Sequence, residues 1–519
     1  MKTPIYIASC LLLLTITAAN PYSAQYNPGP DQLFWFLSIS DTHIENKLEG
    51  GNQPVDNLNW ATSELLETVQ PQFMVLTGDI TEGKDGGLIP TGQSDAEWQN
   101  YRAIVDSNGM SPDSYFDMPG NHDQYNEADL NHYLEYSVLG QATGAINHAW
   151  TREDTAGKTL FIALATCGSD GAPWPVDNGG LDNDDMAFLQ TTLNAHQDAD
   201  IIVLFGHHPA QANYYWSDGL QQFQQIMEDW DVSAYIFGHS HEYSMQWSFG
   251  TLQVNVASLG KSAHHQVGLY AFDGRGLAAK VFDAGDWPQV LLTAPLDSNL
   301  AGAHLHDYMV PQSMPAAPIR ALAFHPDGVE QVTAAIDDGP AFDLELLEDN
   351  IWQGTFDPSG LDEYPHKLTI IAYAAGAIDL QNATFYVFPE PVPPIDESLQ
   401  DMVEYAEPAD DILEQDSLPE APFEVVTQPE PATDMYVPDL ATDSQVDLDF
   451  DGFAELMEDW QEEVDAPLPV DQGTPATGYL PVDSDGCAHN QRGPSGSSGL
   501  ILLLMIGLSL LVACRRQAE

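Results

Sequence analysis

The segment Asp117–Asn126, DMPGNHDQYN, places an asparagine, a histidine and an aspartate side by side directly after a glycine. Such a run favours neither a helix nor a strand, because Gly, Asn and Asp are typical of turns. The preceding residues, SYFDMP, form a short apolar run that fits one buried strand. We therefore expect Asn121, His122 and Asp123 to lie on a turn at the end of a strand.

The same arrangement recurs between about Leu33 and Gly285, where short apolar runs alternate with longer amphipathic segments. This alternation is typical of a layered α/β domain. The polar clusters that follow apolar runs are Asp41 with His43, Gly78 with Asp79, Asn121 with His122 and Asp123, His207 with His208, and His239 with His241. Loops past the carboxyl ends of strands are where open sheets bind ligands, so we expect these clusters to meet.

The side chains in these loops are suited to divalent metal ions. Imidazole and carboxylate ligands together favour first-row divalent metals, and two ions about 3.5–4 Å apart can bind the attacking and the leaving oxygen of a phosphoryl group. The candidate ligands are Asp41, His43, Asp79, Asn121, His207, His239 and His241. A carboxylate that bridges the ions would fix their separation. The sequence therefore predicts a two-metal site for phosphoryl chemistry.

The order D-x-H, GD, GNHD, GHHP and GHSH resembles that of the calcineurin-like metallophosphoesterases. The resemblance implies a four-layer α/β/β/α sandwich and a hydrolase that uses two divalent ions. By the family pattern, Asp41, His43 and His241 would hold the first ion, Asn121, His207 and His239 the second, and Asp79 would bridge them. The ions would activate water near neutral pH, so no Ser or Cys nucleophile is needed.

The resemblance also implies two catalytic residues. His122 matches the residue that polarises the phosphate or protonates the leaving group, and Asp123 matches the acid that orients this histidine. His208 could replace His207 as a metal ligand. Purple acid phosphatases have a tyrosine ligand three residues after the bridging aspartate, where this chain has Glu82. A charge-transfer iron site is therefore not expected, and Mn, Zn or Fe(II) remain open.

Segments further along, such as GDWPQVLLTAPLDS and IRALAFHPDGVEQVTAAIDDG, resemble the lumenal part of the transmembrane protein 62 type of metallophosphoesterase. In that type an immunoglobulin-like domain follows the enzyme. Short alternating segments such as HKLTIIAYA and ATFYVF independently favour strands. We expect a metallophosphoesterase domain over residues 25–285, a connector over 286–302 and a small all-β immunoglobulin-like sandwich over 303–389.

The net charge of −65 is concentrated in one part of the chain. Glu390–Asp485 contains 28 Asp or Glu residues and no Lys or Arg, interspersed with proline. Self-repulsion and low hydrophobicity predict a disordered, extended acidic linker over residues 390–486. The whole chain has only 14 basic residues. A nucleic-acid partner is not expected, because binding to phosphates requires basic surface.

Within this linker, residues 447–458, DLDFDGFAELME, fit the twelve-residue EF-hand loop. The candidate calcium ligands are Asp447, Asp449, Asp451, the backbone carbonyl of Phe453, and Glu458 as the closing carboxylate. A solvated acidic stretch is the alternative, since the sequence contains no partner loop. Calcium binding here would be weak, in the range of extracellular sites.

The first residues, 1–24, have the basic start, apolar middle and small-residue finish of a secretory signal peptide. Cleavage could follow Ala19 or Ala24. A buried strand or an uncleaved anchor is the alternative interpretation. A signal peptide would place the catalytic domain outside the cytoplasm.

Residues 487–519 contain Cys487, a Gly/Ser spacer, the apolar run Leu500–Cys514 and two arginines. This order resembles the myxobacterial-type sorting tails of bacterial surface proteins, in which the cysteine can carry lipid. A helix of this run would span about 22 Å, so it needs its Gly/Ser flank to cross roughly 30 Å of hydrocarbon. The arginines favour a cytoplasmic C-terminus. We expect an exported protein anchored at the bacterial cell surface or membrane by a single transmembrane helix.

Two other functions compete with metal-dependent hydrolysis of a phosphodiester or phosphomonoester. A non-catalytic binding or adhesion module would keep the metal site for structure and use the β-sandwich for contacts. It predicts a damaged site, whereas Asp79, His122 and Asp123 are all present. A nuclease would require Lys and Arg along a groove. Hydrolysis of a phosphate ester is therefore the expected activity, with the substrate left open.

Overall fold

The computed structural model describes residues 32–45, 53–84, 90, 92–155, 157–168, 179–211, 216, 219–261, 264–300 and 309–388. The predicted signal peptide, acidic linker, EF-hand-like loop and C-terminal tail lie outside these residues, and the predictions for them stay predictions. Within the described ranges, no helix is long and apolar enough to cross a membrane.

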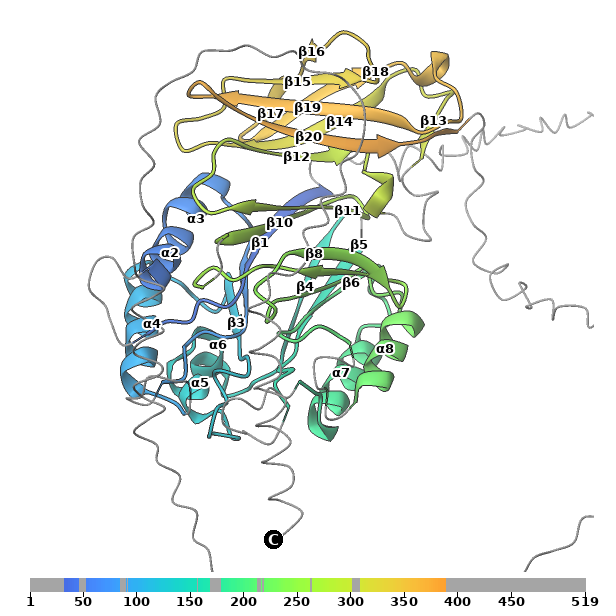
Figure 1. Cartoon of the computed structure of the whole chain (residues 1–519). Coiled ribbons are helices and arrows are strands. Elements are labelled where there is room, and N and C mark those ends of the chain that lie inside the picture. The colour runs from blue at the N-terminus through green and yellow to red at the C-terminus, as the bar shows by residue number, and fades with distance from the viewer. Residues whose placement is uncertain are drawn as a thin grey trace, which may run out of the picture. The chain divides into compact units, whose positions relative to one another are not determined.

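The first domain is built on two mixed sheets (Figure 1). One sheet has the strand order β11-β10-β1-β2-β3. Its strands are β1 (Leu33–Ile39), β2 (Met74–Thr77), β3 (Tyr115–Met118), β10 (Gln266–Asp273) and β11 (Gly276–Asp283). Strands β1, β2 and β3 run parallel, so their carboxyl ends lie at one edge of the sheet. Strand β10 pairs with β1 in the antiparallel sense.

The other sheet has the order β4-β5-β6-β7-β9-β8. Its strands are β4 (His148–Asp154), β5 (Gly157–Ala163), β6 (Ile201–Phe205), β7 (Ala234–Phe237), β8 (Ser244–Ser248) and β9 (Thr251–Asn255). Strands β5, β6, β7 and β9 are parallel, and the edge strands β4 and β8 are antiparallel to their neighbours. The apolar runs of the central strands β6 and β7 fit strands that are covered on both faces.

Aromatic side chains fill the space between the two sheets. Phe36 on β1 stacks on Tyr270 of β10 with ring centroids 5.0 Å apart, and meets Phe205 of β6 edge to face at 6.0 Å. Phe161 on β5 lies 5.9 Å from Phe36 in the same edge-to-face manner. Such aromatic pairs add to the free energy gained from burial. The two sheets therefore pack face to face and share one hydrophobic core.

Helices cover the outer face of each sheet (Figure 1). Those that pack against the first sheet or one another beside it are α2 (Gln53–Thr62), α3 (Glu64–Val69), α4 (Asp95–Ser107), α5 (Asn131–Tyr136) and α6 (Val138–Thr143). Those on the second sheet are α7 (Asn183–Ala195) and α8 (Leu220–Asp229). On α8, Phe223 and Met227 lie four residues apart and are both buried, as expected for an amphipathic helix. The predicted α/β domain is confirmed.

A β region follows the first domain. Its strands are β12 (Gln289–Ala294), β13 (Val310–Pro311), β14 (Ala317–Phe324), β15 (Gln331–Ile336), β16 (Phe342–Asp343), β17 (Glu345–Glu348), β18 (Ile351–Phe356), β19 (His366–Ala374), β20 (Ala377–Phe385) and β21 (Val387–Phe388). They form two antiparallel sheets, β12-β14-β18-β17 and β16-β15-β19-β20, and a short parallel pair of β13 with β21. The prediction of a β region after the α/β domain is confirmed.

Strand β12 lies within residues 286–302, which we expected to be a connector. The segment QVLLTA pairs with β14 and is buried along its length. The partner of β12 is β14, which lies more than 20 residues later in the chain. The sequence around β12 does not indicate such a distant partner. The β region thus begins earlier in the chain than the sequence suggested.

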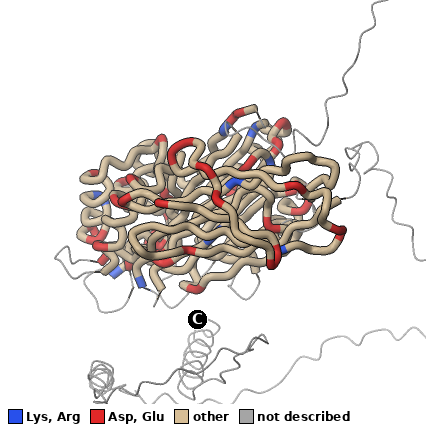
Figure 2. The backbone as a smooth tube through the Cα atoms, turned by 90° about the horizontal axis from the view of Figure 1, so that it is seen from above, with Lys and Arg blue, Asp and Glu red and all other residues tan. Residues whose placement is uncertain are grey.

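The β region and the first domain share a buried polar contact. Arg320 on β14 donates from Nη1 to Asp273 Oδ1 at the end of β10, at 2.5 Å. Thr293 Oγ1 on β12 donates to the other carboxylate oxygen at 2.8 Å. Figure 2 shows how few basic residues the described chain holds among its acidic ones. One of these few basic residues, Arg320, connects the β region to the first domain.

Candidate metal centre

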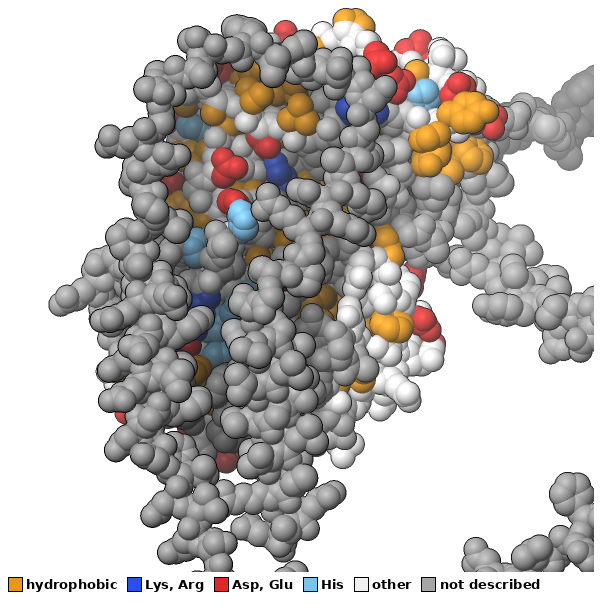
Figure 3. Space-filling view, in the orientation of Figure 1, with side chains coloured by type: hydrophobic (Ala, Val, Ile, Leu, Met, Phe, Trp, Pro, Cys, Tyr) orange, Lys and Arg blue, Asp and Glu red, His pale blue; other side chains and the backbone are white. Residues whose placement is uncertain are grey.

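The five loops singled out in the sequence all follow strands of the first domain. Strand β1 leads to Asp41 and His43, β2 to Asp79, β3 to Asn121, β6 to His207, and β7 to His239 and His241. These strands belong to both sheets, and the parallel ones end at the same edge. The structure brings all seven predicted ligands together. Figure 3 shows pale-blue histidine side chains reaching the surface of the first domain beside acidic and basic ones.

One group of ligand atoms gathers around His241. Its Nε2 lies 3.0 Å from His43 Nε2 and 3.2 Å from Asp41 Oδ1. His43 Nε2 lies 3.8 Å from Asp79 Oδ2. The atoms offered by these four residues are all within 4.8 Å of one another. This is the set that the family pattern assigns to the first ion together with the bridging aspartate.

A second group gathers around Asn121. Its Oδ1 lies 3.1 Å from His207 Nε2 and 3.2 Å from His239 Nδ1. His207 Nε2 lies 3.3 Å from Asp79 Oδ2. The neighbouring His208 has Nδ1 3.4 Å from the Thr166 hydroxyl, and it offers a ligand atom within 4.8 Å of those of His207 and His239. The distances therefore favour His207 over His208 as the ligand that shares a metal with Asp79.

These distances fit bound metal ions. Ligand atoms that surround an ion at about 2.0–2.2 Å stand about 3.0–3.5 Å from one another. The closest approaches of 3.0, 3.1, 3.2 and 3.3 Å in the two groups fall in this range. Among the described residues, Asp41 Oδ1 is buried and has no hydrogen-bond partner. A divalent cation would satisfy this oxygen and the converging imidazole nitrogens.

The ligand loops have unusual backbone conformations. Asp41, His43, Asp79, His239 and His241 all have positive φ, between 46° and 74°. This left-handed region is uncommon for residues other than glycine and is often found at functional sites. Backbone bonds from Asp41 N to Gly78 O and from His43 N to Asp79 O, each 3.0 Å, tie two of the loops together. The fold thus stabilises a backbone shape that aims the ligands inward.

Polar contacts of Nδ1 constrain the rings of two histidines. His207 Nδ1 lies 2.7 Å from the carbonyl oxygen of Thr77, so Nδ1 carries a proton and Nε2 is the nitrogen that can bind a metal once its own proton is lost. His43 Nδ1 lies 3.2 Å from the Glu82 carboxylate, a distance that allows an ion pair. Metal-binding histidines typically donate their other ring N–H in this way.

The glycines of the motifs allow the loops to approach closely. Gly78 has φ of 93°, and a Cβ there would lie 2.6 Å from His207 Nδ1. At Gly120 a Cβ would lie 2.5 Å from the backbone nitrogen of Asp79. Neither position can accept a side chain without moving a ligand. Steric contact therefore explains why glycine precedes Asp79 and Asn121 in the GD and GN motifs.

His122 and Asp123 lie beside the metal ligands and make different contacts. His122 Nε2 is 3.9 Å from Asp79 Oδ2, and its side chain is 14% exposed. The expectation that Asp123 orients His122 was wrong, because His122 Nδ1 contacts the carbonyl oxygen of Glu82 at 2.7 Å. The carboxylate of Asp123 instead accepts backbone N–H groups from Gly120, Ile80 and Thr81 at 2.9–3.0 Å. Asp123 thus supports the loops that carry Asp79 and Asn121.

The charges in the cluster shift one another's pKa. Burial raises the pKa of Asp79, but the nearby imidazoles of His207 and His122 outweigh it and hold the pKa well below the usual range. Burial lowers the pKa of His207, yet the Asp79 carboxylate raises it to about 10. Burial lowers the pKa of His43 to about 4, and burial raises that of Asp123 to about 7. A metal ion must therefore displace a proton from His207 when it binds.

Sequence reasoning missed the surroundings of Glu82. This residue was considered only as the position where a tyrosine ligand is missing. Its buried carboxylate faces His43 and is paired with the ammonium groups of Lys84 and Lys261. The acid that follows Asp79 by three residues was the available signal, but its partners come from segments far apart in the sequence.

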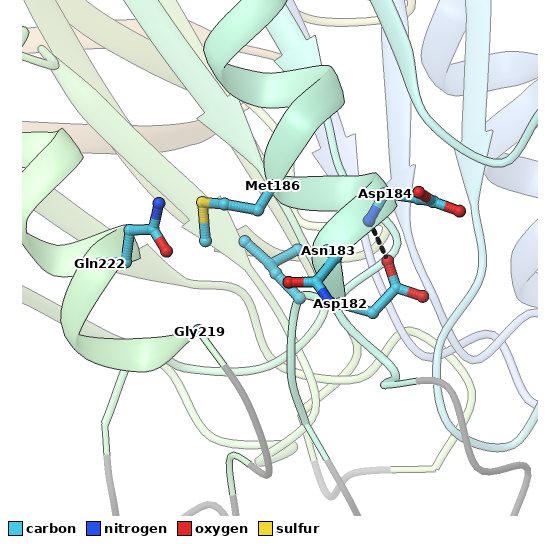
Figure 4. Close-up of a pocket in the computed structure, with 7 residues that line it drawn as sticks. Asp182, Asn183, Asp184, Met186, Gly219 and Gln222 are labelled. Carbon is cyan, nitrogen blue, oxygen red and sulfur yellow. Dashed lines mark hydrogen bonds between the residues drawn. The ribbon is translucent and has the colours of Figure 1, made fainter.

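A separate cavity of about 510 Å³ lies at the N-terminus of α7 (Figure 4). It is lined by Leu181, Asp182, Asn183, Asp184, Met186, Gly219 and Gln222. Asp182 Oδ1 accepts the backbone N–H of Asp184 at 2.8 Å and caps the helix. None of the predicted metal ligands lines this cavity. The predicted ligands gather instead at the carboxyl ends of the strands.

Comparison with known proteins supports this description. Residues 34–243 match the sequence model of the calcineurin-like phosphoesterase family. Transmembrane protein 62 of Mus musculus is 26% identical over 365 residues, which cover 67% of this chain and 55% of that protein. A protein of Arabidopsis thaliana named as a metallophosphoesterase is 25% identical over 227 residues, which cover 40% of this chain and 30% of that one. The chain thus spans about half or less of these relatives.

Solved structures give distant matches. The anchor GAP50 in the inner membrane complex of Plasmodium has a TM-score of 0.36 and 14% identity, covering 49% of this chain and 85% of that one. A 5'-nucleotidase from Candida albicans has a TM-score of 0.32 and 14% identity, covering 50% of this chain and 52% of that one. Both scores are low, and the fold described above depends on the strand order and packing alone.

Proposed function

We propose that the chain hydrolyses a phosphate ester at two divalent metal ions, Mn, Zn or Fe, because residues 34–243 match the calcineurin-like phosphoesterase family. The observation that carries this proposal is the position of Asp79. Its Oδ2 lies 3.8 Å from His43 Nε2 in one ligand group and 3.3 Å from His207 Nε2 in the other. A carboxylate that faces two imidazole groups can bridge two ions and hold them at the separation that phosphoryl chemistry requires.

The ions, when bound, would supply Lewis-acid stabilisation of the phosphoryl oxygens and a nucleophile from water near neutral pH. The residues of the chain then have distinct tasks. Asp79 and the other ligands fix the positions at which the phosphate oxygens bind. His122 keeps Nδ1 on the Glu82 carbonyl oxygen, which leaves Nε2 facing the cluster. In its charged form, His122 can donate a proton from Nε2 to the departing oxygen.

The test is a comparison of two substrates on the metal-stripped full-length chain. Mn, Zn or Fe(II) would be added back, and hydrolysis of bis-p-nitrophenyl phosphate and p-nitrophenyl phosphate would be measured. We expect turnover that requires metal and is lost in Asp79→Asn, and the ratio of the two rates separates a diesterase from a monoesterase. Tight metal binding without turnover of either ester would favour the alternative, a binding or adhesion module that keeps the metals for structure.

We also propose that the β region is an immunoglobulin-like domain. In chain order, β12, β14, β17 and β18 fill one sheet in the positions of strands A, B, D and E. Strands β15, β19 and β20 fill the other in the positions of C, F and G, with β16 as an added edge strand. A four-layer enzyme domain followed by such a sandwich agrees with the resemblance found in the sequence.

The sequence patterns at the two ends support a proposal for location. The signal peptide over residues 1–24 and the tail over 487–519 favour an exported enzyme that is anchored at the cell surface or membrane. The acidic linker between enzyme and tail would keep the domain extended away from the membrane. Fractionation of cells that express the full chain, followed by protease treatment of intact cells, tests this: protection of the catalytic domain would contradict it.

A further inference from the structure

Glu82 is a buried carboxylate beside the metal centre. Its side chain is 2% exposed, and Oε2 lies 3.2 Å from His43 Nδ1. Its backbone carbonyl accepts from His122 Nδ1 at 2.7 Å. The rings of His43 and His122 lie edge to face with centroids 4.6 Å apart. One residue thus contacts both a predicted metal ligand and the predicted proton donor.

We propose that the Glu82 carboxylate is a positioning residue that fixes the tautomer and the orientation of His43. With the proton of His43 on Nδ1 and directed to Glu82, Nε2 presents its lone pair to Asp41, His241 and Asp79. Partners of this kind orient metal-binding histidines and make them more basic ligands. This inference rests on the proposed function, because it assumes that His43 binds a metal.

Two lysines hold Glu82 in place. Lys84 Nζ lies 3.5 Å from Glu82 Oε1 and also 3.1 Å from Glu45 Oε1. Lys261 Nζ pairs with Glu82 Oε2, the oxygen that faces His43. The chain has only 14 Lys and Arg residues, and two of them pair with this one carboxylate. Charge-assisted bonds from both sides keep this carboxylate ionised and restrict its rotation.

The segment around Glu82 is itself anchored to the protein. The backbone nitrogen of Glu82 donates to the carbonyl of Ile44 at 3.1 Å, next to His43 in the chain. Glu97 Oε2 accepts the backbone N–H groups of Gly83 at 2.9 Å and Lys84 at 3.1 Å. Because backbone contacts hold the loop, changing only the Glu82 side chain should leave the loop and the carbonyl contact to His122 in place.

The experiment is an Mn²⁺ titration of the metal-stripped full-length chain by calorimetry, together with the melting temperature of the metal-free protein. The variants are Glu82→Gln, which keeps an acceptor but not the charge, and Glu82→Ala, which keeps neither. The matched control is Glu127→Gln, because Glu127 Oε1 also contacts a histidine nitrogen, His132 Nδ1, at 2.8 Å but lies outside the metal centre.

We expect the wild type and Glu127→Gln to bind two Mn²⁺ ions with the same affinities. Glu82→Ala should weaken one of the two sites by about 10–100-fold and Glu82→Gln by less, with metal-free melting temperatures close to the wild type. Unchanged affinity at both sites in the Glu82 variants would overturn the inference. Equal weakening of both sites with a lower metal-free melting temperature would assign Glu82 a structural role instead. A wild type that binds no Mn²⁺ would refute the proposed function itself.

Discussion

Two buried groups of charged side chains in this molecule differ in how completely they satisfy one another. At the contact between the first domain and the β region, Asp273 accepts from Arg320 at 2.5 Å and from Thr293 at 2.8 Å. Arg320 Nε also donates to Gln353 Oε1 at 3.2 Å. Opposite charges and hydrogen bonds are matched, and all partners come from the chain.

The metal centre is unmatched by comparison. The Nε2 atoms of His43 and His241 stand 3.0 Å apart, and Asp41 Oδ1 has no hydrogen-bond partner among the described residues. Imidazole nitrogens and carboxylate oxygens from several loops converge there at distances typical of ligands around an ion. The difference teaches that burial of charge alone does not identify a functional site. The sign of a site is a buried polar cluster that only an added ion completes.

The largest effect is expected from Asp79→Asn, which removes the carboxylate that faces both ligand groups. The variant should lose at least about 1,000-fold in kcat/KM, because loss of the ions forfeits several kcal/mol of transition-state stabilisation. The rate is measured with the ester that the wild type hydrolyses, at saturating metal. A variant with more than a tenth of the wild-type rate would contradict the bridging role. The free energy of unfolding of the metal-free protein should fall as well, because the variant leaves buried His207 without its carboxylate partner.

The matched contact should respond in the opposite way. Arg320→Met leaves Asp273 buried and unpaired, so the free energy of unfolding should fall by about 3–5 kcal/mol. The double variant Arg320→Met with Asp273→Leu should recover most of this loss. Urea denaturation measures both. Metal affinity of the folded Arg320→Met protein should match the wild type, and a large fall in that affinity would break the distinction drawn between the two clusters.

Metal addition should stabilise only proteins with an intact centre. At a free Mn²⁺ concentration 100 times the dissociation constant, one site adds about 2.7 kcal/mol to the free energy of unfolding. We expect this gain in the wild type and in Arg320→Met, and its absence in Asp79→Asn. Thermal denaturation with and without metal shows it. Equal stabilisation of all three proteins would mean that Mn²⁺ acts elsewhere on the chain.

The last effect depends on pH and concerns Glu97, a buried acid beside the centre that contacts none of the predicted metal ligands. Burial raises its pKa to about 8 from an ordinary value of 4.5. The folded state therefore holds this proton in a pH range where the unfolded state has released it. Stability falls as pH rises between these two values, by up to about 1.4 kcal/mol per pH unit from this group, and the loss is complete above pH 8.

Glu97→Gln removes this titration. The unfolding free energy of the variant minus that of the wild type should therefore rise from pH 5 to pH 8 and level off above it. Urea denaturation at several pH values gives the difference, in which the contributions of other titrating groups cancel. Parallel curves for the two proteins would show that Glu97 is not the group responsible.

The positions of the predicted ligands followed from the sequence because their signal is local. Asp79 comes directly after an apolar run, and the run predicts a strand whose end carries it. Parallel strands end at one edge, so several such loops converge without further information. The same reasoning located the α/β domain and several strands of the β region, but not β12.

The partners of buried polar groups were not predictable in this way. Asp123 was expected to orient His122, but its carboxylate binds the backbone of three neighbouring positions in space instead. The contact of Glu82 with His43 and the pairing of Arg320 with Asp273 join residues 39 and 47 positions apart. Such contacts depend on how the sheets and loops pack, which a pattern within one segment does not encode.

The most direct test of the central claim is a count of metal ions bound per chain. Purified full-length protein would be stripped of metal, incubated with excess Mn²⁺, passed through gel filtration, and analysed for metal by mass spectrometry, with Asp79→Asn in parallel. The account predicts two ions per wild-type chain and fewer than one per chain of the variant. No retained metal in the wild type, or the same number in both proteins, would contradict a centre bridged by Asp79.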